Sequence, residues 1–317
     1  MIKTIYAAAF VFVFAGAALA QTAAPLETIL DEAHKQTENY RETFRNLLAD
    51  ETKTFEDYDR SGKAGEKTVV KSNFLVYQSG KDPRATTELR NITEVDGKPV
   101  GNSQKRSEEF LAELAKEKTL EKELQKIQKE GTRYDKTWEV YSLTINPAVA
   151  LAPNLRPFFE FKVLGTELYQ GSGNEVYVVG FQQTRPSPFI SVNGKQAAGE
   201  GLSLDFKLDV PGELKKTNVF LRGKLWIDAK TFQLWREERE LAVQTAAPLL
   251  LLANVFEYQA SDFGILVPKT ILLDIFTIKK EKGADRFVSV KDAEMIFEYT
   301  KFRQTNVEVR ILDDETE

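Results

Sequence analysis

Residues 218–241 constrain the fold more than any other stretch, because they predict two long strands joined by a tight turn. On the first strand, Leu221 and Leu225 lie on one face and Arg222 lies on the other. This period of two is typical of a half-buried strand. Asp228 suits the first position of the turn, where its side chain can accept hydrogen bonds from the backbone that follows. The stretch therefore predicts an antiparallel sheet.

Residues 1–20 predict a secretory signal peptide. Lys3 supplies a positive start, residues 6–14 form a short apolar run, and Ala18 and Ala20 favour cleavage after Ala20. A transmembrane anchor is the alternative, but a membrane span needs about 20 apolar residues. We therefore expect a chain that is in the periplasm or secreted, and that does not span a membrane once the signal is removed.

The composition argues against several classes of partner and chemistry. The 317-residue chain has no cysteine, one histidine (His34) and a net charge of −5. An acidic balance disfavours nucleic acid and anionic membrane surfaces as partners, and zinc is rarely held by carboxylates with at most one histidine. The sequence has no glycine-rich nucleotide loop and no G-x-S-x-G motif. We therefore predict no cofactor, no metal and no catalytic residue, although 48 acidic residues leave a carboxylate-dependent hydrolase open as a hypothesis.

The rest of the sequence predicts helices followed by many strands. Residues 25–50 carry apolar side chains at spacings of three and four, which predicts an amphipathic helix. Residues 103–130 predict a highly charged helical insert, whose Glu residues form either a solvated face or an acidic docking stripe. Further strands are predicted at 52–58, 68–78, 86–95, 158–163, 175–183, 188–192, 202–210, 249–258, 266–278, 287–297 and 307–312. This order predicts a single α+β domain over 21–312, with helices packed on one side of a large antiparallel sheet, and an acidic tail at 313–317.

Several predicted strands carry large apolar residues on both faces. Residues 158–163, 175–183 and 271–278 are the main examples. A sheet with one face in water should instead alternate apolar and polar residues. Both faces are therefore expected to be covered, by an ordinary thick core or by helices on one side and a ligand on the other.

Short motifs resemble those of a set of exported, uncharacterised bacterial proteins. The motifs are NITEVDGKPV at 91–100, TRPSPFI at 184–190, GKLWID at 223–228, Val267-Pro268 and YTKFR at 299–303. The last three also resemble the Lol-type lipoprotein carriers of the periplasm. That resemblance implies a curved antiparallel sheet, an incomplete barrel, that wraps around helices and takes up acyl chains on its concave face. The charged residues 103–130 have no counterpart in those carriers.

Our leading hypothesis is a non-enzymatic envelope protein that binds or carries a lipid or acyl chain. The alternative is a structural or protein-interaction module of the envelope without a small ligand, and the hydrolase comes third. The partners implied are a lipid or lipoprotein, or another envelope protein. We also expect Trp226 or Trp235 to be buried. From strand alternation and the position of one loop arginine, the candidate ligand-binding residues are Phe161, Tyr177, Phe181, Arg185, Trp226 and Phe276.

Overall fold

The computed structural model describes residues 24–45, 47–59, 62–78, 86–101, 105, 109, 121–135, 140, 142–193 and 201–304. The predicted signal peptide, the last predicted strand (307–312), the acidic tail and most of the predicted helical insert lie outside these ranges. Within them, no helix is both long enough and apolar enough to cross a membrane.

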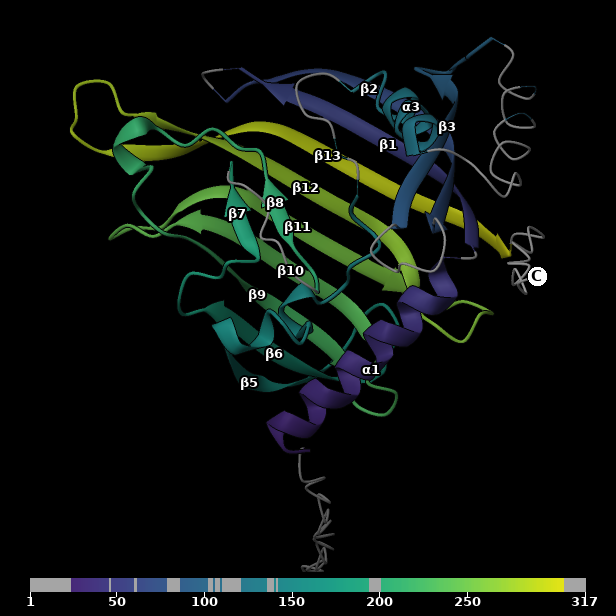
Figure 1. The fold of residues 1–317 in the computed structure, drawn as a ribbon, viewed down its shortest axis with the longest axis horizontal. Helices are drawn as coiled ribbons and strands as arrows, with labels where there is room; N and C mark the ends of the chain where they lie inside the picture. The colour runs from purple at the N-terminus through teal and green to yellow at the C-terminus, as the bar shows by residue number, and fades with distance from the viewer. Residues whose placement is uncertain are drawn as a thin grey trace, which may run out of the picture.

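The described residues form an eleven-stranded antiparallel sheet in the order β4-β3-β2-β1-β13-β12-β11-β10-β9-β6-β5. The sheet curves without closing, and β4 and β5 are its two edges (Figure 1). The predicted incomplete barrel is therefore confirmed. The strands are β1 (Leu47–Tyr58), β2 (Ala64–Gln78), β3 (Thr86–Val95), β4 (Lys98–Pro99), β5 (Phe159–Leu168), β6 (Glu175–Gln183), β9 (Val219–Asp228), β10 (Leu234–Val243), β11 (Leu249–Gln259), β12 (Val267–Lys280) and β13 (Phe287–Gln304).

Helices are few in the described part of the chain. They are α1 (Leu26–Phe44), α3 (Glu121–Gly131) and the short 3-10 turns η2 (Val149–Leu151), η3 (Arg156–Phe158) and η4 (Gly212–Leu214). The predicted N-terminal helix is confirmed up to Phe44, but its extension to Asp50 is wrong. Residues 47–50 begin β1, because Leu47 and Ala49 alternate with less buried neighbours and enter the core of the sheet.

One face of the sheet packs against α1 and residues 142–158, and we call it the inner face. Side chains from β1, β2, β11, β12 and β13 meet there in one apolar core. Tyr40 and Phe44 of α1 stack on each other and reach Tyr258 and Phe74 of the sheet. The helix α3 packs against β3, where Gly131 lies directly against Arg90. The helix α1 is thus packed on the sheet as predicted, whereas Ile127 of α3 packs with Leu75 and Leu89, which alternate with inward-facing residues of β2 and β3.

The hairpin β9–β10 forms as expected from the sequence. The Asp228 carboxylate accepts the backbone N–H groups of Lys230 and Thr231, both at 2.9 Å, which closes the turn. The same carboxylate accepts the indole N–H of Trp235 at 3.0 Å. Trp235 and Trp226 are both buried, which confirms the expectation for this pair.

A small second sheet joins β7 (Ile190–Val192) and β8 (Leu204–Phe206) in parallel, and we call it the minisheet. Its strands are shorter than the predicted segments 188–192 and 202–210. In Figure 1 the minisheet lies in front of the large sheet, and its apolar side chains pack against the main core. The inner face is thus covered by three separate pieces: α1, residues 142–158 and the minisheet.

Candidate functional site

Residues 142–158, which we call the strap, fill the space between α1 and the inner face. The side chains of Val149, Leu151 and Leu155 are fully buried in the main core. The hydroxyl of Tyr40 on α1 donates to the carbonyl oxygen of Thr144 at 2.9 Å. The strap is therefore in contact with the sheet on one side and with the helix on the other.

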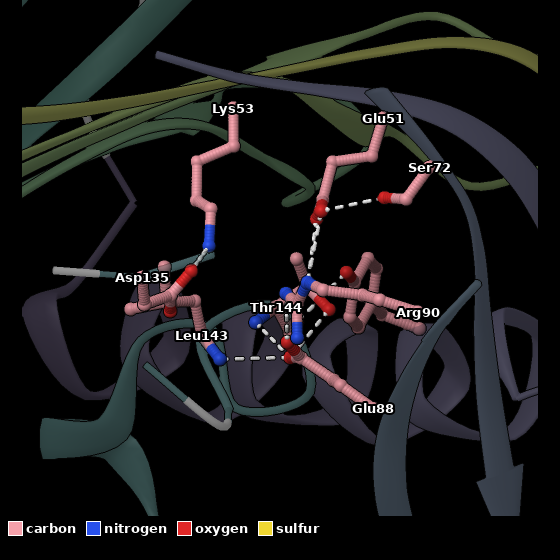
Figure 2. Close-up of polar contacts among 9 residues, drawn as sticks. Glu51, Lys53, Ser72, Glu88, Arg90, Asp135, Leu143 and Thr144 are labelled. Atoms are coloured by element: carbon pink, nitrogen blue, oxygen red, sulfur yellow. Dashed lines mark hydrogen bonds and ion pairs between the residues drawn. The ribbon is translucent and has the colours of Figure 1, made fainter. Parts of the chain in front are cut away.

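Glu88 on β3 holds the start of the strap. Its carboxylate accepts the backbone N–H groups of Leu143 at 2.8 Å and Thr144 at 2.5 Å, and the hydroxyl of Thr144 at 2.8 Å. Arg90 forms an ion pair with Glu88 at 2.8 Å and with Glu51 at 2.9 Å, so the charge of Arg90 lies between two carboxylates (Figure 2). All three side chains are almost completely buried. The cost of burying the negative charge of Glu88 is offset by these hydrogen-bond donors. In turn, the carboxylate fixes the backbone whose N–H groups it binds.

Glu237 on β10 holds the middle of the strap in the same way. Its carboxylate accepts the backbone N–H of Ala148 at 2.8 Å. Arg239 pairs with Glu237 at 2.8 Å and donates to the carbonyl oxygen of Asn146 at 3.3 Å. Ala148 adopts a left-handed conformation with φ of 45°, which few non-glycine residues do without support. Five strands separate β3 from β10 in the sheet, yet only three residues lie between Thr144 and Ala148, so the strap joins two strands that are far apart in the strand order.

Lys53 on β1 forms a third buried contact, an ion pair with Asp135 a few residues before the strap (Figure 2). Burial, together with the nearby Arg90 cation, lowers the pKa of the Lys53 ammonium to about 8. The inner face therefore carries three buried groups of paired charges, and the strap is attached at two of them.

These buried acids do not form a catalytic pair. Glu51 accepts hydrogen bonds from Arg90 and from the hydroxyl of Ser72, and Glu88 is occupied by Arg90 and the strap. Both carboxylates are buried and bound to protein groups, so neither is available to a substrate in this arrangement. Among the described residues, no group of three or more His, Cys, Asp or Glu side chains lies close enough together to hold a metal ion.

Three of the predicted site residues come together on the inner face of β5 and β6. Phe161 is paired directly with Phe181 across the two strands. The Phe181 ring lies against Gly223, where a Cβ atom would come within 2.6 Å of it, so only glycine leaves room for the ring. Tyr177, further along β6, stacks on Phe232 with 6.5 Å between ring centroids. Phe161 is only partly buried, unlike Tyr177 and Phe181.

The other three predicted residues lie elsewhere. Arg185 is in an exposed loop, where it donates to the carbonyl oxygen of Pro157. Trp226 alternates with inward-facing neighbours and lies on the outer face, donating its indole N–H to Glu167 at 2.8 Å. Phe276 follows the inward-facing Ile275 and therefore points to the outer face.

The pocket that the described residues line on the inner face is small. A cavity beneath α1, lined by Tyr40, Pro147, Tyr258 and neighbours, measures about 20 Å³, enough for about one water molecule. The larger hollows are open depressions of about 470 Å³ around Gly180 and about 1360 Å³ around Tyr169 and Trp226. Both are lined by many charged and amide side chains. An apolar ligand on the inner face would therefore have to displace part of the cover.

The minisheet is the least tightly packed part of that cover. Its four apolar residues contact the main core, but each is only partly buried, as are two inward-facing residues of β5. These six residues, the apolar seam, are Phe161, Val163, Ile190, Val192, Leu204 and Phe206. At the seam, apolar side chains that pack against the core also reach the surface.

The sequence hypotheses did not include Glu88 or Glu237, the residues that attach the strap. The sequence does carry a signal for Glu237. Glu237 and Arg239 lie on the same face of their strand as Leu241, which is the apolar face. A charged pair on the apolar face of a strand needs a buried partner. The sequence pattern indicates such a partner but not its position, because the partner lies 89 residues away.

Comparisons with known proteins show distant likeness only. No family model matches the chain, and neither does any curated protein. Similar solved structures include a DUF1329 family protein from Desulfovibrio piger, with 10% identity, 90% of this chain and 95% of that chain covered, and a TM-score of 0.39. A LolA superfamily protein from Nitrosomonas europaea has 10% identity, 90% and 95% coverage and a TM-score of 0.34. A domain ascribed to outer membrane lipoprotein sorting from Vibrio parahaemolyticus has 10% identity, 86% and 94% coverage and a TM-score of 0.35.

The resemblance predicted from short motifs is therefore also found among solved structures. Since identities are 10% and TM-scores lie below 0.5, function has to be argued from the residues of this chain.

Proposed function

We propose that this is a non-enzymatic envelope protein that binds a lipid or acyl chain on the inner face of its sheet. The observation that carries the proposal is the apolar seam, the partly buried apolar side chains of the minisheet and of β5. Its residues pack against the core yet remain partly exposed, so a chain of methylene groups could extend the core there. Free lipid or the acyl groups of a lipoprotein would provide the same chemistry.

Binding requires the minisheet to move away from the large sheet. Each buried methylene group of a ligand contributes about 0.8 kcal/mol, so an acyl chain offers enough free energy to displace a weakly packed cover. In this proposal Phe161, Tyr177 and Phe181 supply the aromatic surface under the chain, with few rotamers to restrict. Arg185, two residues beyond the end of β6, could contact a charged head group.

Titration of the mature protein with a fluorescent fatty acid tests this proposal. Phe161→Asp should weaken saturable binding by about tenfold or more, because a carboxylate would enter the apolar seam. Phe276→Asp is the matched variant on the outer face, and it should leave affinity within about twofold. If Phe276→Asp weakens binding and Phe161→Asp does not, the ligand binds outside the inner face. Circular dichroism of each variant controls for unfolding.

The second candidate function, an interaction module without a small ligand, is favoured by the filled inner face and by two exposed leucines. Leu164 and Leu168 on β5 are 52% and 71% exposed. If the folded wild-type protein shows no saturable binding of any acyl probe, this function replaces the first.

Export is part of both proposals and has a direct test. The mature protein recovered from the periplasm or the medium should begin at Gln21, as measured by intact mass and N-terminal peptides. Recovery of a chain that retains Met1 to Ala20 would contradict export with cleavage.

A further inference from the structure

The two edges of the large sheet differ in how well they are protected. The edge strand β4 has two residues, and one of them is Pro99, which has no backbone N–H to offer. The other edge strand, β5, has ten residues. None of the described strands pairs with the edge of β5 that faces away from β6. Just before β5 begins, Arg156 forms ion pairs with Glu27 and Asp31 of α1. A long unpaired edge is a template for another strand.

Among the described residues, the exposed large hydrophobic side chains lie on this edge strand. Leu164 and Leu168 are the large hydrophobic residues that stand out as exposed among the described residues. On a soluble protein, an edge strand with such side chains indicates a partner.

A β-bulge in β5 decides which side chains face which way. Val163 pairs with Val179 and Gly165 with Val178, so Leu164 is an extra residue. Before the bulge, Phe161 faces inward and Lys162 outward. After the bulge the parity changes: Glu167 faces outward, where it accepts the indole N–H of Trp226, and Leu168 faces inward.

We propose that β5 pairs antiparallel with β5 of a second copy of this chain, around a two-fold axis between residues 164 and 165. Phe161 then lies opposite the partner's Leu168, and Lys162 lies opposite the partner's Glu167. Inward side chains meet inward ones and outward meet outward, which the bulge makes possible in this register. Leu164 meets the partner's Gly165, which has no side chain to obstruct it. The two inner faces become one continuous surface.

Charge complementarity is the argument for a second copy as the partner. Lys162 and Glu167 are both exposed, and the two-fold axis makes their pairing occur twice. The apolar pair and the charged pair come from the same register, so a single alignment satisfies both.

Sedimentation velocity of the mature chain over a range of concentrations tests the proposal. Wild type should form a dimer, and Lys162→Glu should raise its dissociation constant by on the order of tenfold or more, because two pairs of like charges then face each other. The double variant Lys162→Glu with Glu167→Lys should restore the dimer. The control is Lys224→Glu, on an exposed residue of β9 away from the edge, which should change nothing.

A wild type that is monomeric at every concentration would overturn the proposal. So would a double variant that stays as weak as Lys162→Glu while circular dichroism shows it folded. Because the chain has no cysteine, Leu164→Cys offers a second measurement. Mild oxidation should convert it into a disulfide-linked dimer, and Lys224→Cys should not cross-link. Cross-linking of both to the same extent would show random collision and count against the pairing.

Discussion

The strap and the minisheet cover the same face of the sheet in different ways. The strap is fully buried at Val149 and Leu151, and two buried carboxylates, Glu88 and Glu237, bind its backbone. No residue of the minisheet is fully buried, and its polar attachments involve amides, such as the Asn154 side chain of the strap with the backbone of Leu202, two residues before β8. Since local opening begins where burial and strong hydrogen bonds are fewest, the minisheet should open first.

The difference also shows how buried charge is used in this fold. The Glu51–Arg90–Glu88 and Glu237–Arg239 groups lie on the sheet itself, so they stay paired whether or not the strap is present. The strap adds neutral backbone donors to an already compensated site. It therefore binds strongly without leaving a lone charge behind, and the minisheet has no equivalent.

The largest expected effect comes from Glu88→Ala. It removes three hydrogen bonds to the strap and one partner of a buried ion pair, so the free energy of unfolding should fall by about 3–5 kcal/mol. Glu88→Gln keeps the shape and an acceptor but loses the charge, and should cost less. Urea unfolding measures both. A loss below about 1 kcal/mol for Glu88→Ala would show that the strap is no better attached than the minisheet.

A smaller effect is expected from Asn154→Ala, which removes two hydrogen bonds to Leu202 at 2.8 and 3.2 Å. Gly201 lies so close to the Asn154 side chain that a Cβ atom there would come within 2.5 Å of it, so this contact fixes the approach to β8. The cost in stability should be about 1–2 kcal/mol.

Amide hydrogen exchange shows where that loss falls. In Asn154→Ala the amides of 190–192 and 204–206 should exchange faster, while those of Leu143, Thr144 and Ala148 should stay protected. Equal acceleration in both segments would mean that strap and minisheet open as one unit, and the comparison would fail.

The same comparison shows how far the sequence could lead. Local patterns predicted the β9–β10 hairpin, the bounds of β3 and β6 and the class of fold, because each depends on alternation or turn chemistry within about ten residues. They overextended α1 to Asp50, because Leu47 and Leu48 fit the helical spacing as well as the strand. They could not show that Phe161 and Phe181 lie on the inner face while Trp226 and Phe276 lie on the outer face. That assignment depends on registers and bulges set by neighbouring strands.

Asp228 provides the test with the smallest expected effect, because it is a buried carboxylate that attaches neither cover. Burial raises the pKa of its carboxyl group, but hydrogen bonds from Trp235, Thr231, Lys230 and Asn174 outweigh this, and the pKa lies below its usual value. A lowered pKa in the folded state means that Asp228 stabilises the fold above the pKa of the unfolded chain, about 3.9, and loses this contribution as the pH falls through the folded value. Urea midpoints between neutral pH and about pH 3 should therefore decline less steeply in Asp228→Asn than in wild type. In this variant, the amides of the minisheet should still exchange faster than those of the strap. If Asp228→Asn instead opened the strap, attachment by buried carboxylates would be a property of the whole sheet, and the contrast between the two covers would need another cause.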